Sequence, residues 1–126
     1  MNTKFKIVLG VAVGAALGAA AMQGLHAQAK PKAYIVTESE ILDAANAAAY
    51  GPVNQAAQKA AGGRSFRTTG KVTAIVGTAP QRAGLSEWDS LEQVQAWLNS
   101  AARKNLEPQR AKAIKIVRQY VVEAAN

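Results

Sequence analysis

Cysteine is absent from this 126-residue chain, and histidine occurs only once, at His26. Without cysteine the protein cannot form a disulfide, use a thiolate nucleophile or bind zinc through sulfur. Acidic residues are also few, since 8 Asp and Glu stand against 15 Lys and Arg and leave a net charge of +7. Apart from this histidine, any chemistry must therefore come from carboxylates, cations, hydroxyls and three tyrosines.

Residues 1–29 have the composition of a secretory signal peptide. A basic start with Lys4 and Lys6 precedes a long uncharged stretch, and small residues follow up to Ala29. The apolar stretch is rich in Gly and Ala and shorter than the roughly 20 residues that span a bilayer, which favours cleavage after Ala29 over retention as an anchor. We therefore expect a periplasmic or secreted protein with one domain at 30–126 and no stable membrane span after cleavage.

Cleavage at that point would remove His26. The mature chain would then hold 13 basic and 8 acidic residues, a net charge of +5, and no histidine. A Ser–His–Asp triad and a histidine zinc site are excluded, and we expect neither a metal nor a cofactor. The basic residues near the C-terminus lack the aromatics and the module of a nucleic-acid interface, so we interpret them as a solvated helix face and expect no nucleic-acid partner.

The stretch "AGGRSFRTTGK" (61–71) has the glycines and the lysine of a phosphate-binding loop but not their spacing. A P-loop needs GxxxxGK[ST] between a strand and a helix. Here Gly63 and Gly70 are seven positions apart instead of five, and Val72 stands where serine or threonine is required. The stretch also follows a predicted helix, so we interpret it as a turn.

Strand-forming and helix-forming segments alternate along the mature chain. Residues 32–40 predict a strand, and the Ala-rich stretch after it predicts a helix that breaks at Gly51–Pro52 and restarts. Gly62 and Gly63 are expected to end this helical region. The later segments predict a hairpin at 64–69 and 71–77, a weaker strand at 81–88, a helix capped by Ser90, a helical stretch interrupted by Pro108, and a strand at 114–123.

This order, β-α-β-β(β)-α-β, predicts an α+β protein with the ferredoxin-like arrangement, an antiparallel sheet with both helical regions on one face. The first and the last predicted strands of the chain carry apolar residues on both sides. In the last strand Ile116, Arg118, Tyr120 and Val122 share one side, and Val117, Gln119 and Val121 share the other. Because neither side suits open water, we expect a homodimer in which two sheets pack together around a partly polar space.

Several phrases occur in an order that resembles one bacterial family. They are "AYIVTESEILD", "AAGGRSF", "GKVTAIVG" and "EWDSLEQVQAWLNS". Over residues 33–123 the chain is similar to the domain of unknown function DUF1330, whose membership of the dimeric α/β-barrel group implies two ferredoxin-like protomers packed sheet to sheet. The family has no established reaction, so the resemblance implies a fold more than a function.

The resemblance also singles out individual positions. Arg64, Glu87 and Asn99 match polar residues that recur in the family. After "NS" the family usually continues with Pro-Glu-Tyr, whereas this chain has Ala101, Ala102 and Arg103. A ligand or activity shared with the family is therefore in doubt if this segment lines a pocket.

Three functions fit these observations. The favoured one is a non-catalytic exported module that binds a small anionic or planar organic molecule between sheet and helices, because guanidinium groups pair with carboxylates and stack on rings. The alternatives are an enzyme, such as a cofactor-independent oxygenase or isomerase with Glu87 as its base, and an envelope protein-interaction module.

Trp97 is a further candidate for the pocket wall, although core packing is the favoured role of this residue and of Trp88. The predicted ligand-binding residues are Tyr34, Arg64, Glu87, Asn99, Arg118 and Tyr120.

Overall fold

The computed structural model describes residues 29–125. Apart from Ala29, the predicted signal peptide lies outside these residues, and a compact unit begins at Pro31. The elements are β1 (Ala33–Ile41), α2 (Ala44–Ala60), β2 (Arg64–Ser65), β3 (Arg82–Trp88), α3 (Leu91–Leu98), α4 (Ala101–Ala113) and β4 (Ile114–Glu123).

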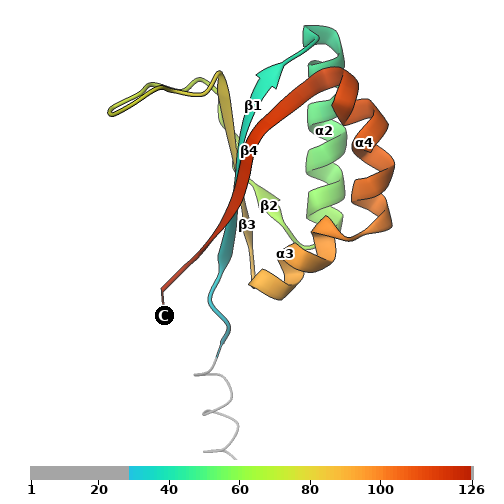
Figure 1. The fold of residues 1–126 in the computed structure, drawn as a ribbon. Coiled ribbons are helices and arrows are strands. Elements are labelled where there is room, and N and C mark those ends of the chain that lie inside the picture. The colour runs from blue at the N-terminus through green and yellow to red at the C-terminus, as the bar shows by residue number, and fades with distance from the viewer. Residues whose placement is uncertain (1–28, 126) are drawn as a thin grey trace, which may run out of the picture. The chain divides into compact units, whose positions relative to one another are not determined.

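The four strands form one antiparallel sheet in the order β2-β3-β1-β4. The three helices of residues 29–125 lie on one side of it, which we call the helix face, and no helix of the compact unit covers the opposite, outer face (Figure 1). This is the strand order and the layering of a ferredoxin-like fold, so the predicted α+β class is confirmed.

The helix termini follow the predicted capping signals. The Ser90 hydroxyl accepts a hydrogen bond from the Gln93 amide at 3.2 Å, and the Gln93 side chain accepts one from the Asp89 amide at 3.0 Å. This reciprocal pair fixes the start of α3. Helix α2 ends where predicted, because Gly62 adopts a positive φ of 96° directly after the last turn.

Both predicted helix breaks are wrong. Helix α2 continues through Pro52, and α4 continues through Pro108. A proline inside a helix removes one backbone hydrogen bond and leaves the carbonyl four residues earlier without its donor. Since both prolines are exposed, that carbonyl can be hydrated, and neither helix has to end.

The buried core is small and lies where α3 packs on the sheet. Trp88 and Trp97 stack with ring centroids 5.9 Å apart, and Ala33, Ile35 and Val94 complete the cluster. The Trp88 indole is buried and donates to the Ser86 hydroxyl at 3.0 Å. Both tryptophans are therefore core residues, as the sequence favoured.

Gly63 lies directly against this core. A Cβ atom at that position would lie 2.5 Å from the Trp88 ring, far inside the ordinary carbon–carbon contact distance of about 3.5–4.0 Å. The second glycine of the "GGR" phrase is thus required by packing.

Helix α2 packs in a different way, because none of its residues is buried. Eight of its 17 residues are alanines, whose short side chains do not fill the space between the helix and the sheet. The core is consequently confined to one end of the sheet, and the other end is hollow beneath α2 and α4.

The predicted strand at 71–77 is also wrong. After β2 the chain still bonds to β3 twice, from the Phe66 amide to the Leu85 carbonyl and from the Ala83 amide to the Gly70 carbonyl. It then leaves the sheet and returns at β3, the segment predicted as the weaker strand. Residues 71–79, which we call the arm, project from the outer face of the sheet (Figure 1). Their β-branched residues suit a strand, but no neighbouring strand of the described chain pairs with them.

A β-bulge makes the predicted side of Ile116 in the last strand wrong. The register between β1 and β4 shifts between Glu38 and Ser39, so that one residue of β4 is extra. Ile116 therefore faces the helices, whereas Arg118, Tyr120 and Val122 lie on the outer face.

Candidate functional site

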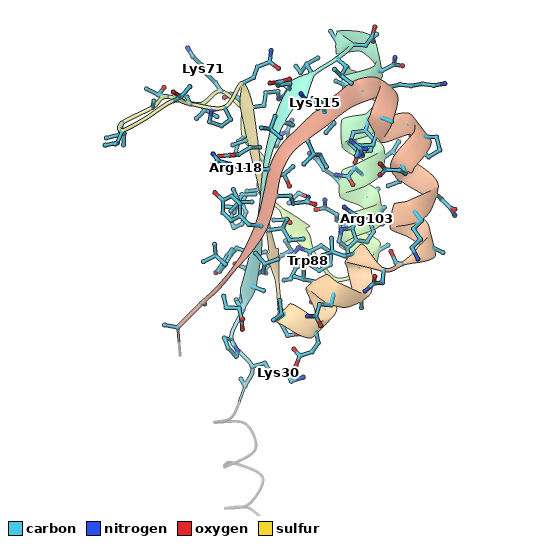
Figure 2. All side chains as sticks on the ribbon, in the orientation of Figure 1. Lys30, Lys71, Trp88, Arg103, Lys115 and Arg118 are labelled. Atoms are coloured by element: carbon cyan, nitrogen blue, oxygen red, sulfur yellow. The ribbon has the colours of Figure 1, made fainter. Side chains whose placement is uncertain are left out.

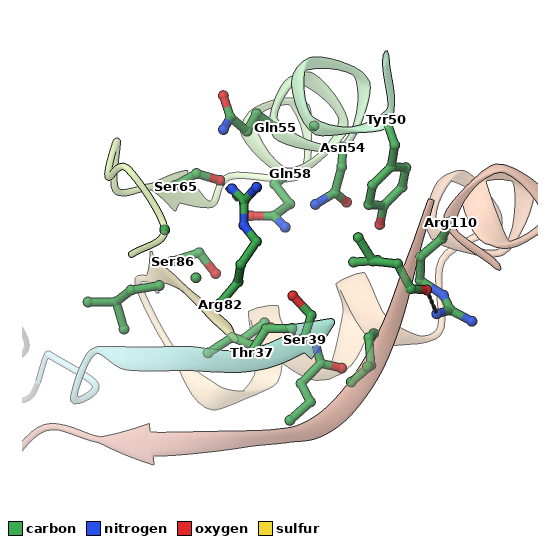
Figure 3. Close-up of a pocket in the computed structure, with 18 of the residues that line it drawn as sticks. Thr37, Ser39, Tyr50, Asn54, Gln55, Gln58, Ser65, Arg82, Ser86 and Arg110 are labelled. Carbon is green, nitrogen blue, oxygen red and sulfur yellow. Dashed lines mark hydrogen bonds between the residues drawn. The ribbon is translucent and has the colours of Figure 1, made fainter. Parts of the chain in front are cut away.

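A pocket of about 230 Å³ occupies the hollow between the helix face of the sheet and helices α2 and α4 (Figure 3). Its apolar wall includes Ile35, Trp97 and Leu106, which also belong to the core or pack against it. Its polar wall carries side chains from both helices and from all four strands of the sheet, namely Thr37, Ser39, Tyr50, Asn54, Gln58, Ser65, Arg82, Ser86, Arg103, Glu107, Arg110 and Gln119.

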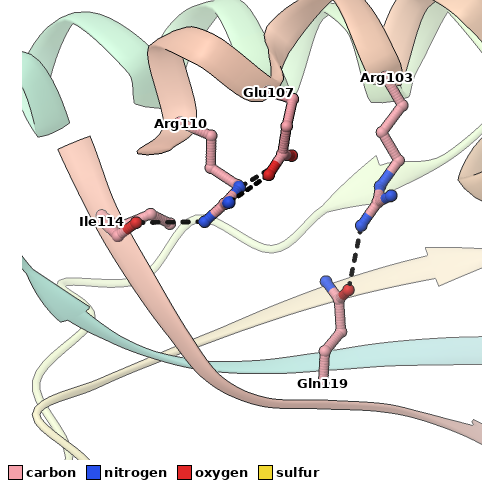
Figure 4. A network of polar contacts seen from close by, with 5 residues as sticks. All are labelled: Arg103, Glu107, Arg110, Ile114 and Gln119. Carbon is pink, nitrogen blue, oxygen red and sulfur yellow. Dashed lines mark hydrogen bonds and ion pairs between the residues drawn. The ribbon is translucent and has the colours of Figure 1, made fainter. Parts of the chain in front are cut away.

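The charges that line the pocket are unequal. Arg82, Arg103 and Arg110 supply three positive charges, and Glu107 supplies the only negative one. Arg110 neutralises that carboxylate, since its Nε donates to Glu107 at 3.0 Å while another guanidinium nitrogen donates to the Ile114 carbonyl at 3.2 Å (Figure 4). The hydrogen bond from Arg110 lowers the pKa of Glu107, so this carboxylate is ionised at neutral pH and the pocket keeps an excess of two positive charges.

Arg103 is held at the floor of the pocket by a chain of side-chain hydrogen bonds. Its guanidinium donates to the Gln119 amide oxygen at 3.3 Å (Figure 4), and the Gln119 amide donates to the Thr37 hydroxyl at 2.9 Å. Arg103 belongs to the segment in which this chain departs from the Pro-Glu-Tyr of the family it resembles. This segment therefore contributes a positively charged side chain to the pocket wall.

Arg82 differs from the other two arginines, because its side chain makes no ion pair and no hydrogen bond with any residue in the range 29–125. Its guanidinium points into the pocket beside Gln58 (Figure 3). The backbone of Gly70 passes close by, and a Cβ atom there would lie 2.8 Å from the Arg82 guanidinium. Arg82 is thus the cation of the pocket that is available to a ligand.

Tyr50 places a hydroxyl on the α2 side of the pocket. Burial raises the pKa of this phenol above 10.0, and the positive charges of Arg110 and Arg103 oppose the rise. The phenol is therefore neutral at physiological pH, where it can donate one hydrogen bond and accept others.

None of the six predicted ligand-binding residues lines this pocket. The register of the sheet places Tyr34, Arg64, Glu87, Arg118 and Tyr120 on the outer face. Figure 2 shows Arg118 on that side of the sheet and Trp88 and Arg103 on the side of the helices. The expectation that these residues surround a space between sheet and helices is therefore wrong, and of the residues proposed for that wall only Trp97 lines the pocket.

The polar residues of the outer face are paired with one another. Glu87, the candidate base, contacts Lys32 at 2.6 Å and also forms an ion pair with Arg64, its partner in the β2–β3 register. Glu38 is buried and accepts from Arg118 at 2.9 Å. Each of these carboxylates is held by cations outside the pocket, so Glu87 is not part of the chemistry of the pocket.

Asn99, the sixth predicted residue, lies at the C-terminus of α3, where its side-chain amide donates to the Gln95 carbonyl at 3.0 Å. All three polar residues that match the family pattern thus have structural contacts, two in an ion pair and one at a helix end.

Sequence reasoning missed the pocket residues Tyr50, Arg82 and Arg110, because none of them lies in a recognisable motif. One signal for the pocket was present, namely the high alanine content of the first helix. A helix with so few large side chains cannot fill the groove above a sheet.

No group of three or more His, Cys, Asp or Glu side chains within residues 29–125 is arranged to hold a metal ion. None of the helices described is long and apolar enough to cross a membrane.

Comparison with known proteins identifies the family. The model of the Domain of unknown function (DUF1330) matches residues 32–125. The chain belongs to this family. A search of curated proteins found no match.

Solved structures resemble the DUF1330 chain in fold. The crystal structure of RPA0582, a protein of unknown function from Rhodopseudomonas palustris, superposes with a TM-score of 0.62 at 11% identity and covers 84% of this chain and 92% of its own. The methylated RPA0582 protein gives a TM-score of 0.61 at 11% identity, with 84% and 90% covered. At this identity the likeness concerns the fold alone.

Proposed function

We propose that the protein is an exported homodimer that binds a small organic anion in the pocket beneath α2 and α4. The observation that carries this proposal is the excess of two positive charges in a partly apolar cavity, with one arginine side chain, that of Arg82, left without a partner among residues 29–125. A guanidinium can bind a carboxylate through two parallel hydrogen bonds, and the Tyr50 hydroxyl and the Gln58 amide supply further polar contacts.

The dimensions and the walls of the pocket limit the ligand. A volume of about 230 Å³ is below the range of about 300–1,000 Å³ that is usual for drug-sized ligands. Trp97 and Tyr50 give the wall two aromatic rings, which suit a planar ligand body. The ligand class is therefore a small, planar or compact carboxylic acid.

The proposal is tested with a charged probe and its neutral analogue. Benzoate and benzamide have the same shape, but only benzoate carries a negative charge. Isothermal titration calorimetry is expected to detect benzoate and not benzamide. The substitution Arg82→Gln is expected to weaken benzoate binding by roughly 10- to 100-fold, because a hydrogen bond to a charged group contributes about 1.5–3 kcal/mol.

Arg67→Gln is the matched control. It removes an exposed arginine that does not line the pocket, and benzoate affinity should be unchanged. Native mass spectrometry of the protein purified from its producing cell complements the titration by detecting a retained acid. Absence of any retained small molecule, together with no binding of benzoate, would contradict the proposal.

The outer face supports the homodimer. Among the residues that the structure describes, Leu85, Tyr120 and Val122 expose large apolar side chains there and lie beside the paired carboxylates. A second copy of the same face would cover these groups without leaving a charge unpaired. Analytical ultracentrifugation tests this part of the proposal, and a monomer at high micromolar concentration would contradict it.

Export rests on the sequence of residues 1–29. A mature protein whose measured mass begins at Lys30, recovered from the periplasm or the medium, is the expected result. An intact N-terminus in the cytoplasmic fraction would contradict export.

A further inference from the structure

We propose that the arm, residues 71–79, is a clasp that packs against the second copy in the homodimer. This inference rests on the proposed homodimer and assigns a part of its interface that the sheet alone does not provide. The occupant of the surface formed by the arm and the outer face is thus a second copy of this chain.

The tip of the arm is apolar and almost entirely exposed. Ile75 is 97% exposed and Val76 is 92% exposed, more than any other large apolar residue that the structure describes. The arm carries one charge, Lys71, at its base. Two adjacent aliphatic side chains held this far from the core have no role in the stability of the single chain.

The backbone of the arm is also without partners. Within residues 29–125, no hydrogen bond connects the amides from Val72 to Ala79 to another group. An extended segment with free amide and carbonyl groups can accept another chain beside it. The arm therefore offers both apolar side chains and unpaired backbone to a partner.

The arm points to where a second copy would lie. It projects from the outer face, on the side opposite the helices (Figure 1). The tip at Ile75 is five positions after Gly70, whose carbonyl still bonds to Ala83. That distance allows a reach of up to about 17 Å, whereas packed sheets are about 10 Å apart, so the arm is long enough for its tip to extend past the plane of a facing sheet.

The area of the sheet gives a reason for such a clasp. Strands of this length cover about 450 Å² in plan, at about 3.3 Å per residue and 4.8 Å between strands. Even with the relief of its side chains this is a small interface by the standard of about 800 Å² per partner. Two arms, one from each copy by two-fold symmetry, enlarge the contact at both of its ends.

The charge of the outer face favours a second copy over a membrane surface. The cations Lys32, Arg64 and Arg118 nearly balance the carboxylates of Glu38 and Glu87, to which they are paired. An anionic bilayer is bound by clusters of several Lys and Arg residues, and the outer face and the arm contain no such cluster. A nearly neutral apolar surface instead suits contact with its own copy.

The test compares two double variants of the full chain, each purified in the form that the producing cell makes. Ile75→Ser with Val76→Ser removes the apolar tip of the arm. Leu42→Ser with Val53→Ser removes exposed apolar side chains from the helix side and is the control. Sedimentation velocity over a range of concentrations gives the dimer dissociation constant of each protein, and circular dichroism verifies the fold.

The arm variant is expected to weaken the dimer at least 100-fold, about 2.8 kcal/mol at 1.4 kcal/mol per tenfold, because symmetry removes four side chains from the interface. The control is expected to leave it unchanged. If the wild type forms a dimer and the arm variant has the same dimer dissociation constant, the clasp is overturned while the homodimer stands. A wild type that is a monomer would overturn both. Binding of the wild type but not of the arm variant to vesicles of anionic phospholipid, with unchanged dimerisation, would assign the tip to a membrane and overturn the clasp.

Amide hydrogen exchange of the wild type gives an independent measurement. Residues 72–79 should exchange more slowly at concentrations where the dimer forms than where it dissociates. Equally fast exchange in both states would place the arm outside the interface and overturn the proposal.

Discussion

Replacement of Gly63 by alanine tests how tightly the end of α2 is packed on the core. Among the described glycines, positive φ angles occur at Gly62, Gly70 and Gly77 but not at Gly63, so alanine can adopt the backbone conformation there. The cost arises from contact, because the new Cβ would lie 2.5–2.7 Å from three atoms of the Trp88 ring. Trp88 is 1% exposed and stacked on Trp97, so the ring cannot move without disturbing the core.

Overpacking of this kind costs about 1–3 kcal/mol. For a domain of this size each kcal/mol corresponds to a decrease of roughly 4–8 °C in Tm. The matched control is Gly51→Ala, since a Cβ at that position in the interior of α2 meets nothing within 4 Å. Replacing a helical glycine by alanine stabilises by about 0.5–1 kcal/mol, so the two substitutions should have opposite signs.

Urea unfolding followed by far-UV circular dichroism measures both effects, provided that the slope of the transition is the same in all three proteins. A Gly63→Ala variant with a midpoint at or above that of the wild type would refute the packing argument.

Two further predictions concern single side chains. Ser90→Ala should lower the free energy of unfolding by about 1 kcal/mol because it removes the cap of α3, whereas the exposed Gln95→Ala should be nearly neutral; equal urea midpoints for the two would contradict the capping role. Tyr50→Phe should change how stability depends on pH above pH 10. The pKa of Tyr50 is raised in the folded state, so as pH rises through 10 the phenol of the unfolded chain loses its proton first and the wild type loses stability. The Tyr50→Phe variant has no such proton and should not show this loss. Urea midpoints of both proteins from pH 9 to 11 measure this difference, and parallel curves would contradict it.

The parts of the fold that local chemistry determines were predictable. Runs of β-branched residues indicate the strands at 33–41 and 114–123. The first helix ends at Gly62, which adopts a positive φ, and α3 starts at its cap, Ser90. These signals act within a few residues of the chain, so they do not depend on what the rest of the molecule contributes.

The errors have a common cause, which is the environment that each segment meets. The prolines at 52 and 108 do not break their helices, because the carbonyls they leave free are accessible to water. The run at 71–77 has the composition of a strand but no partner strand within the described chain, and the plainer segment at 82–88 takes the place between β1 and β2. Which segments pair depends on the tertiary fold, so composition alone predicted the wrong segment as the paired strand.

The candidate site could be predicted only in part. The sequence predicted that arginine and aromatic residues surround a pocket. Such residues do line the pocket, but apart from Trp97 they are not the ones that were predicted. The bare outer face was inferred from apolar residues on both sides of the strands, and the same alternation placed Tyr34 and Tyr120 there instead of beneath the helices. The pocket arises from side chains that are missing, the alanines of α2, and a search for functional groups does not detect such a space.

Trp97 has a consequence for how this protein can be studied. Its ring belongs both to the buried core and to the wall of the pocket, where it stacks on the only other tryptophan of the chain. A molecule that enters the pocket must displace water next to this indole and alter the polarity around it. The protein therefore contains a built-in fluorophore at the site, and a screen for its natural ligand needs neither a label nor a known reaction.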